Sequence, residues 1–358
     1  MLGLDESIKD WFASQVSVWQ LKNGRHDLPW QKTRDPYKIW VSEVMLQQTQ
    51  VKTVIPYYLK FLKKFPSIRS LAEADLDSVL VIWSGLGYYS RARNLHQAAR
   101  TIKTQHSGRF PSDFESIVGL RGIGKSTAGA ILVFAFNERF SILDANVKRV
   151  VTRFFYNVLD VGATHSINQL WSLVDDLVPS EGIVEYTQGL MDLGAGICKP
   201  SAPICELCPL IKHCCAYARG LFDVNQKPKS RQKSVVTKNY LVFKRGAHII
   251  LQKGSSSGIW PDLLNFPECT NDQLIKLPFL LQQNKFQFGE ISQLPALTHE
   301  LTHLKIAIRA FLIEISSSRR PRLINNSTWI NMSDLDNHPI PKVVRKIIAL
   351  VVRRKIPA

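Results

Sequence analysis

Apolar residues recur at helical spacing through the first part of the chain. The segments with this period are residues 5–22, 36–51, 53–110 and 147–195. In the first of them Trp11, Phe12, Val16 and Trp19 fall on one side, as in a helix with one buried face. Prolines and glycines separate the segments. The pattern predicts a mainly α region over residues 1–224.

Further along, the period changes to that of β-strands. Residues 235–243 and 248–252 read as two strands joined at Arg245 and Gly246. Two more strands, a short helical turn and a closing basic helix are predicted at residues 304–315, 327–332, 333–335 and 341–353. The pattern predicts a smaller α+β domain over residues 235–358.

A basic segment lies between the two regions. Residues 225–234 hold four positive charges and no large apolar side chain. Such a composition is typical of a linker, and its charges could also lie against a DNA backbone or another partner.

The whole chain carries a formal charge of +17, which favours a polyanionic partner. Nucleic acid comes first and an acidic membrane surface second, and charge alone does not separate them. The first residues show no secretion signal, and the longest apolar runs are too short to span a bilayer. We therefore expect a cytoplasmic protein with no membrane partner.

Residues 119–128 indicate a helix, a tight glycine hairpin and a second helix. Gly122 and Gly124 permit a sharp turn, after which an apolar helix opens. The backbone N–H groups of such a hairpin can bind one phosphate. The alternative is an ordinary corner between two helices.

Two carboxylates are candidates for catalysis. Glu43 is the single acid of an apolar helical segment, an environment that raises a carboxyl pKa and suits general acid work. A surface glutamate on an amphipathic helix is the alternative. Asp144 follows the hairpin by about twenty residues and precedes a basic helix. It could cap that helix or face a substrate held by the hairpin.

A loop at residues 84–93 contains two glycines, two tyrosines and two arginines. This composition suits a loop that presses an aromatic ring into a duplex beside cations that bind phosphate. The alternative is a junction of two helices capped by tyrosine.

Five of the six cysteines lie within residues 198–215, which favours a metal site over disulfides in an intracellular chain. Cys198, Cys205, Cys208 and Cys214 have the spacing C-x6-C-x2-C-x5-C. Four thiolates in one loop can bind a tetrahedral metal ion or an iron–sulfur cube. Spacing alone leaves zinc open.

The hairpin, with Asp144 and Asn146 beyond it, resembles the helix-hairpin-helix DNA glycosylase superfamily that includes endonuclease III. In this resemblance Asp144 matches the catalytic aspartate, and the cysteine spacing matches the four-iron, four-sulfur (4Fe-4S) loop. Some members have a lysine directly after the position of Lys125, where it forms a Schiff base with the sugar. Here that residue is Ser126, so the resemblance implies a monofunctional glycosylase.

Almost the whole chain is similar to the MutY family of adenine DNA glycosylases. The residues that carry this similarity are 28–30, 40–51, 85–93, the hairpin, 144–149, the cysteine loop, 258–260 and 266–267. The resemblance implies a monomer that removes adenine mispaired with 8-oxoguanine or guanine in double-stranded DNA and leaves an abasic site. The second domain resembles the NUDIX-like domain that reads 8-oxoguanine, and the hydrolase box of NUDIX enzymes is absent.

The resemblance also implies roles for single residues. Glu43 would protonate adenine, Asp144 would stabilise the sugar cation and Asn146 would position these groups. The residues expected to contact DNA are Gln48, Tyr88, Gly122, Gly124, Ser126, Lys148, Thr302 and His303.

The chain departs from the family pattern at three places. Leu301 replaces the aromatic residue of a Phe-Ser-His motif, Pro261 and Asp262 replace two glycines, and Ala145 replaces a glycine after the catalytic aspartate. Two competing hypotheses are an endonuclease III-type glycosylase/lyase for oxidised pyrimidines and a non-catalytic helix-hairpin-helix module that binds DNA.

Overall fold

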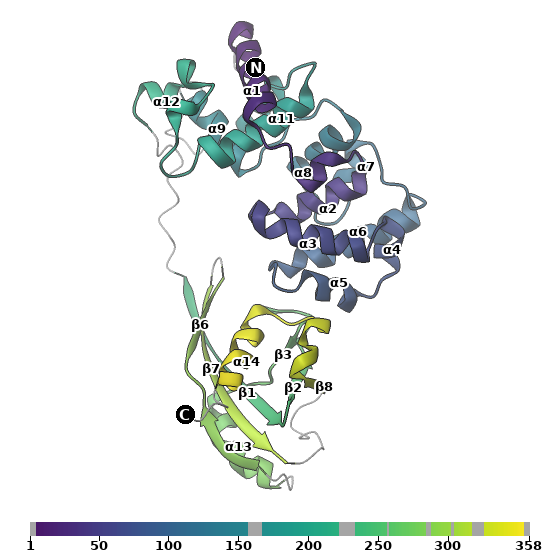
Figure 1. Cartoon of the computed structure of the whole chain (residues 1–358), viewed down its shortest axis with the longest axis vertical. Coiled ribbons are helices and arrows are strands. Elements are labelled where there is room, and N and C mark those ends of the chain that lie inside the picture. The colour runs from purple at the N-terminus through teal and green to yellow at the C-terminus, as the bar shows by residue number, and fades with distance from the viewer. Residues whose placement is uncertain are drawn as a thin grey trace. The chain divides into compact units, whose positions relative to one another are not determined.

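The computed structural model describes residues 5–156, 167–221, 233–255, 258–283, 288–301, 304–316 and 326–353. The chain divides into two compact units. The helical unit comprises Met1–Glu73 with Asn94–Lys229, and the sheet unit comprises Ala74–Arg93 with Ser230–Ala358. Figure 1 shows helices throughout the first unit and the strands gathered in the second.

The helical unit consists of short helices joined by turns. Its α-helices are α1 (Glu6–Asn23), α2 (Pro36–Leu46), α3 (Val51–Lys64), α4 (Ile68–Glu73), α6 (Tyr89–Gln105, which begins in the sheet unit), α7 (Phe114–Val118), α8 (Lys125–Ile131), α9 (Ala145–Phe154), α10 (Ile167–Asp176), α11 (Ile183–Asp192) and α12 (Cys215–Ala218). Turns of 3-10 helix cover Pro29–Lys32, Cys205–Leu207 and Ile211–His213. Turns of π-helix follow α8 and α11, at Leu132–Phe136 and Leu193–Ile197.

Aspartates begin several of these helices. The side chains of Asp5, Asp35, Asp113 and Asp144 each accept a hydrogen bond from a backbone N–H in the first turn of a helix. Such a cap satisfies a donor with no partner inside the helix and stabilises the helix by about 1 kcal/mol. The starts of these helices are therefore encoded locally in the sequence.

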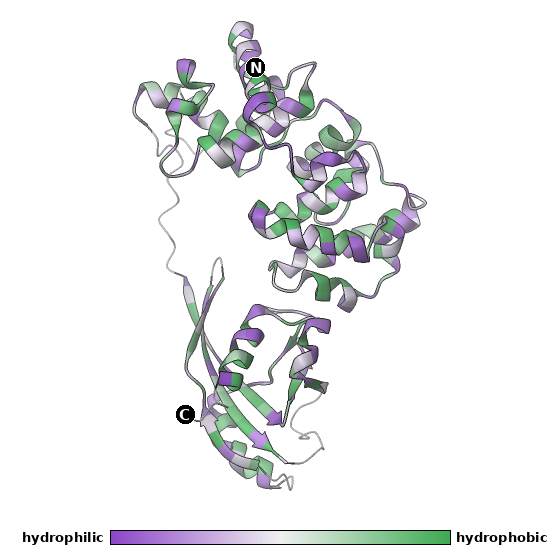
Figure 2. Cartoon of the chain, viewed as in Figure 1, coloured by the Kyte–Doolittle hydropathy of each residue, from purple (hydrophilic) through white to green (hydrophobic). Residues whose placement is uncertain are grey.

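One hydrophobic core of the helical unit lies among α1, α9, α10 and α11. Phe12 and Val16 of α1 are fully buried there, whereas Trp11 and Trp19 pack at its edge and are partly buried. The ring of Phe12 lies 4.8 Å from that of Phe154 on α9. Figure 2 shows hydrophobic and hydrophilic residues mixed along most helices, as expected for helices with one buried side.

The second predicted helix is shorter than the sequence indicates. The spacing predicts a helix over residues 36–51, but α2 ends at Leu46 and α3 begins at Val51. Between them Gln48 has a φ of 55°, a left-handed conformation that a right-handed helix cannot contain. The polar residues before α3 therefore form a turn.

The sheet unit is built on a mixed sheet. Its strands are β1 (Ser234–Arg245), β2 (His248–Lys253), β3 (Leu264–Asn265), β4 (Glu268–Cys269), β5 (Phe288–Gln293), β6 (Leu297–Glu300), β7 (Leu304–Ile315) and β8 (Ser327–Asn331). The order is β3–β2–β1–β7–β5, with β4 beside β1, β6 beside β7 and β8 beside β2. Only β1 and β7 pair in parallel among the described strands, with Ser234 opposite Leu304 and Lys244 opposite Glu314.

Helices complete this unit, namely α5 (Leu76–Trp83), the start of α6, α13 (Asn271–Gln283), a 3-10 segment (Met332–Asn337) and α14 (Lys342–Arg353). Leu277 and Leu281 of α13 pack against Phe243 of β1 and Ile313 of β7, so α13 covers one face of the sheet. The alternating sequence predicts β1, β2, β7, β8 and α14 closely. It does not reveal α13, which contains a proline, the six-residue strand β5, or the strands of only two to four residues.

Residues 74–93 pack with the sheet. The polar contacts that hold them are the pairs Lys253–Asp77, Ser84–Ile340 and Arg93–Pro261, at 2.8, 2.7 and 3.1 Å. Asp262 adopts a φ of 62°, and its carboxylate lies 3.9 Å from Arg93. The two residues that replace glycines in the family pattern thus contact α6.

Candidate active site and four-cysteine loop

Glu43 lies on α2 among buried residues. Its neighbours Ser42, Val44 and Met45 are buried, and Glu43 itself is half-buried. The pKa of Glu43 is raised to about 8, mainly by burial and secondly by the negative charge of Asp144. A carboxyl group with this pKa carries its proton at neutral pH, which suits a general acid. The charge of Asp144 reaches Glu43, so the fold brings the two predicted catalytic carboxylates together.

Asp144 caps the N-terminus of α9. Its Oδ1 accepts a hydrogen bond from the N–H of Val147 at 2.7 Å, and its Oδ2 accepts one from Nδ2 of Asn146 at 3.0 Å. The side chain is therefore held from two directions. A helix N-terminus also favours negative charge, so this position suits a carboxylate that faces a developing cation.

Arg149 holds Asn146 from the other side. Its Nη2 donates to Oδ1 of Asn146 at 2.9 Å and to the carbonyl of Gly194 at 2.5 Å, and its Nε donates to the carbonyl of Cys198 at 2.6 Å. The sequence indicates a basic helix here but not this buried role. A chain of hydrogen bonds thus runs from the cysteine loop to Asp144.

The hairpin has the predicted form. Gly122 has a φ of 84°, and a Cβ there would lie 2.7 Å from Cβ of Asn94, so this position requires glycine. Gly124 caps the N-terminus of α8 and has open space around it. The hydroxyl of Ser126 accepts a hydrogen bond from the N–H of Leu143 at 3.1 Å. Ser126 therefore contacts the segment that leads to Asp144.

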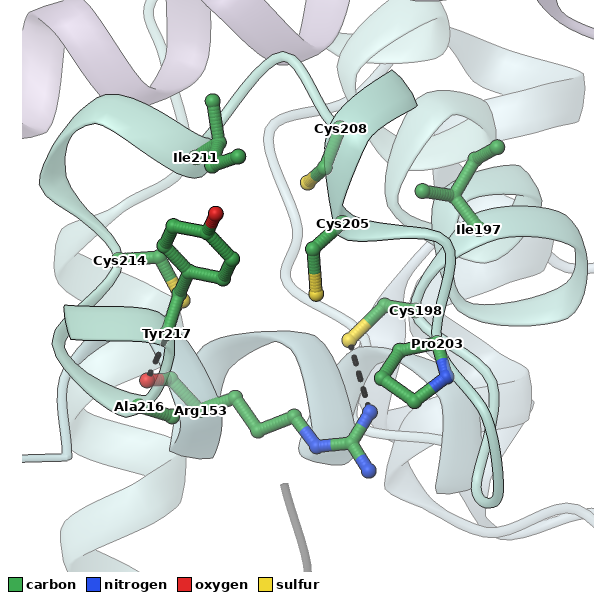
Figure 3. A pocket seen from close by; sticks show the side chains of 10 residues that line it. All are labelled: Arg153, Ile197, Cys198, Pro203, Cys205, Cys208, Ile211, Cys214, Ala216 and Tyr217. Atoms are coloured by element: carbon green, nitrogen blue, oxygen red, sulfur yellow. Dashed lines mark hydrogen bonds between the residues drawn. The ribbon is translucent and has the colours of Figure 1, made fainter. Parts of the chain in front are cut away.

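The four predicted ligand cysteines surround one pocket. Cys198, Cys205, Cys208 and Cys214 line it from the loop between α11 and α12, as Figure 3 shows. Burial raises the pKa of Cys205, Cys208 and Cys214, in the case of Cys208 to about 12. Their thiolates therefore need a cation to be stable. Among the described residues no three His, Cys, Asp or Glu side chains are arranged to hold a single metal ion.

Arg153 of α9 holds the rim of this pocket. Its Nη1 donates to Sγ of Cys198 at 3.3 Å and to the carbonyl of Lys199 at 2.7 Å, and its Nη2 donates to the carbonyl of Pro200 at 3.1 Å. The thiol of Cys214 donates in turn to the carbonyl of Arg153. The helix that begins at Asp144 is therefore joined to the cysteine loop along one side.

Gln48 and Tyr88, the residues expected to enter the duplex, share an unusual backbone. Both have positive φ, 55° and 49°, which few residues other than glycine adopt. Such strain is concentrated at functional sites. Tyr88 is 44% exposed, and the guanidinium of Arg91 lies 5.3 Å from its ring centre. Each belongs to a different unit, Gln48 to the helical one and Tyr88 to the sheet unit.

Of the three remaining predicted DNA contacts, one lies on α9 and two follow β6 in the sequence. Lys148 is exposed on α9. Thr302 and His303 lie outside the described residues, between β6 and β7.

Relatives of known activity cover nearly the full chain. Residues 41–174 match the HhH-GPD superfamily of base excision DNA repair proteins, and residues 239–350 match the NUDIX domain. Over 342 residues the chain is 39% identical to the adenine DNA glycosylase of Buchnera aphidicola subsp. Baizongia pistaciae, which covers 95% of this chain and 96% of that one. It is 41% identical over 399 residues to the human adenine DNA glycosylase, covering 94% of this chain and 73% of that protein.

The chain belongs to the adenine DNA glycosylase family. It is a DNA glycosylase of base excision repair that hydrolyses N-glycosyl bonds and binds DNA. The family predicted from the sequence, and the fold class of a helical region followed by a smaller NUDIX-like α+β domain, are confirmed.

Solved structures of other glycosylases share the helical fold. A thermostable thymine-DNA glycosylase is 31% identical with a TM-score of 0.55, covering 60% of this chain and 98% of its own. Endonuclease III in a non-covalent complex with DNA aligns with a TM-score of 0.53 at 19% identity, covering 61% of this chain and 99% of its own. No helix in the described part of this adenine DNA glycosylase is long and apolar enough to cross a membrane.

The sequence pattern does not identify the residues that hold the candidate active site in place. Arg149 and Arg153 are buried, although arginines of a basic helix ordinarily face solvent. The available signal is their spacing of four residues, which puts both on one side of α9. Besides local partners, both arginines bind residues more than forty positions away in the chain, Arg149 at Gly194 and both at Cys198.

Proposed function

We propose that this enzyme removes adenine opposite 8-oxoguanine or guanine as a monofunctional glycosylase and leaves an abasic site. The observation that carries the proposal is the pair of carboxyl groups on α2 and α9. Glu43 has its pKa raised to about 8, whereas Asp144 lies at a helix N-terminus and accepts two hydrogen bonds. Two carboxyl groups in contrasting environments are the arrangement that acid-catalysed cleavage of a glycosidic bond requires.

The proposed reaction begins when adenine leaves the base stack and enters the site, at a cost of a few kcal/mol. The proton of Glu43 is transferred to N7 of adenine, which makes the base a better leaving group. The C–N bond breaks, and the carboxylate of Asp144 stabilises the cationic sugar. Asn146 keeps Asp144 in position through its amide. Water then adds to the sugar carbon and gives its proton to the carboxylate of Glu43, which restores the acid and completes the abasic site.

The residue after Lys125 supports the absence of lyase activity. Ser126 occupies the position of the Schiff-base lysine, and its hydroxyl accepts a hydrogen bond from Leu143. The amine of Lys125 lies 3.3 Å from the carboxylate of Asp175 and 4.1 Å from the ring centre of Trp171. The amine of Lys125 therefore already has an ion-pair partner and an aromatic partner.

We further propose that Cys198, Cys205, Cys208 and Cys214 bind a 4Fe-4S cluster. The four cysteines line one pocket, and four thiolates are the ligand set of a 4Fe-4S cluster; their spacing C-x6-C-x2-C-x5-C is that of the family's cluster loop. When bound, the cluster would supply the cation charge that keeps the four thiolates ionised and fixes the loop. Arg153 would contribute a hydrogen bond to the sulfur of Cys198.

The division of the chain into two domains suggests that the second domain recognises the base opposite adenine. We propose residues 1–224 as the catalytic region, 225–234 as a linker and 235–358 as the domain that reads 8-oxoguanine through Thr302 and His303. Most of the linker lies outside the described residues. The proposed contacts of the catalytic region with DNA are made by Gln48, Tyr88, Gly122, Gly124, Ser126 and Lys148. A protein with this role would act as a monomer, inside the cell and on DNA.

The test uses a duplex with one adenine opposite 8-oxoguanine, incubated with the protein and divided into samples with and without alkali. Strand cleavage only after alkali is expected, because base removal without lyase activity leaves an intact strand. Cleavage without alkali would identify a lyase. No cleavage in either sample would contradict the adenine assignment, and duplexes with oxidised pyrimidines would then be tested.

Two aspartates provide the matched variants for this assay. Asp144→Asn should abolish the alkali-dependent product, because the amide cannot stabilise a cation. Asp113→Asn replaces another helix cap, whose side chain accepts a hydrogen bond from Ser116. It should leave excision unchanged.

A further inference from the structure

Two glycines on different elements lie against the backbone on either side of Asp144. Gly129 of α8 is buried, and a Cβ there would collide with the carbonyl oxygen of Ser141, three residues before Asp144. Gly194, in the π-helical turn Leu193–Ile197, is also buried. A Cβ there would lie 2.5 Å from Cβ and 2.8 Å from Cα of Asn146, two residues after Asp144.

The segment between these contacts is held at a third point. Ser126, three residues before Gly129, accepts a hydrogen bond from the N–H of Leu143. Residues 141–146 are thus fixed by the hairpin helix on one side and by the turn before the cysteine loop on the other. The backbone at both ends of this segment approaches so closely that a methyl group has no space.

We infer that Gly129 and Gly194 are positioning residues of the reaction, because their missing side chains allow two elements to press on residues 141–146 and so determine where the Asp144 carboxylate lies. The inference rests on the proposed role of Asp144. It assigns a catalytic consequence to two residues with no reactive group. A methyl group at either position would move the aspartate relative to Glu43 and the sugar, and a displacement of about 1 Å can lower a rate roughly 10²-fold.

The chain supplies two matched comparators. Gly196 lies in the same turn as Gly194 and has open space around the position of a Cβ. Gly189 of α11 is also crowded, since a Cβ there would lie 2.8 Å from the side chain and 2.9 Å from the carbonyl oxygen of Val16 of α1. It presses on that helix and not on residues 141–146. The four Gly→Ala variants therefore separate crowding in general from crowding beside Asp144. Alanine is otherwise the better helix former, so a loss cannot come from helix propensity.

The experiment measures the first turnover of adenine excision by the full chain with its cluster, together with duplex binding and the melting temperature. The amplitude of the first turnover counts folded enzyme, and its rate constant reports the chemical step. Gly129→Ala and Gly194→Ala should lower the rate constant roughly 10²-fold with little change in duplex binding. Gly189→Ala should lower the melting temperature and keep the wild-type rate constant. Gly196→Ala should change neither.

A pH profile distinguishes positioning from general destabilisation. The charge of Asp144 is one cause of the raised pKa of Glu43. If Asp144 moves away, the alkaline limb of the rate profile should shift to lower pH in Gly129→Ala and Gly194→Ala only. If neither glycine variant folds, Ser126→Ala tests the same segment without adding an atom and should show the lower rate constant and the shifted limb.

Three outcomes would overturn the inference. The first is a wild-type rate constant in Gly129→Ala and Gly194→Ala. The second is an equal loss in Gly189→Ala, which would tie the rate to fold stability. The third is a wild-type rate in Ser126→Ala when both glycine variants are unfolded. Wild-type protein that excises no adenine would instead contradict the proposed function, and the inference with it.

Discussion

Glu43 is an acid within an apolar part of α2, and its environment should be visible in the pH dependence of the rate. Burial and the charge of Asp144 raise its pKa to about 8. Because the protonated form is the proposed acid, the first-turnover rate should be constant from pH 6 to 7 and fall about tenfold per unit above pH 8. Duplex binding measured at each pH is the control. A rate that stays flat to pH 9.5 would exclude Glu43 as the acid.

The same raised pKa has a consequence for stability. A carboxyl group whose pKa is about 8 in the folded protein and 4.5 in the unfolded chain binds its proton more tightly when folded. Its contribution to the free energy of unfolding therefore falls as pH rises from 4.5 to 8. Glu43→Gln removes this loss, so the variant should be more stable than wild type by about 1–3 kcal/mol at pH 8 while excising no adenine.

Denaturant unfolding at pH 5 and pH 8 measures this effect. The stability difference between Glu43→Gln and wild type should be small at pH 5 and large at pH 8. Glu115→Gln, at an exposed position of α7, is the matched control and should change stability at neither pH. A variant less stable than wild type at pH 8 would mean that the ionised carboxylate is well solvated.

At the scale of elements, α9 connects Asp144, the proposed catalytic aspartate, to the cysteine loop. Arg153 makes three hydrogen bonds to that loop. Arg153→Met keeps the length of the side chain but leaves two loop carbonyls unsatisfied, which should cost about 1–3 kcal/mol. We expect faster loss of the visible absorbance of the proposed 4Fe-4S cluster on heating. Arg219→Met, an exposed arginine close to the loop in sequence, should lose absorbance at the wild-type rate.

The sequence predicts those parts of the structure that depend on neighbours along the chain. Asp35 and Asp144 cap helices that begin at the next residue, and the spacing of the cysteines places four thiols around one pocket. Contacts between distant segments cannot be read this way. Gly194 lies against Asn146 and Arg149 against Cys198, and neither pair shares a local pattern. The sequence therefore indicates the proposed catalytic carboxylates but not the residues that hold them in place.

For the molecule as a whole, we expect the catalytic region to excise adenine and the second domain to recognise the base opposite it. Thr302 keeps the hydroxyl of the family motif, while Leu301 lacks its aromatic ring. A hydroxyl that hydrogen-bonds 8-oxoguanine contributes about 1 kcal/mol, or roughly fivefold in rate at limiting enzyme. Thr302→Ala should therefore reduce the preference for adenine opposite 8-oxoguanine over adenine opposite guanine.

The decisive measurement is the ratio of the two excision rates at limiting enzyme, because a general defect lowers both rates and leaves the ratio unchanged. Thr298→Ala makes the same chemical change on β6, at an exposed position, and should retain the wild-type ratio. If Thr302→Ala also retains it, the hydroxyl does not read the lesion. If both rates fall together, the residue serves the fold or general DNA binding. Only a change in the ratio with the A:G rate preserved assigns lesion recognition to the second domain.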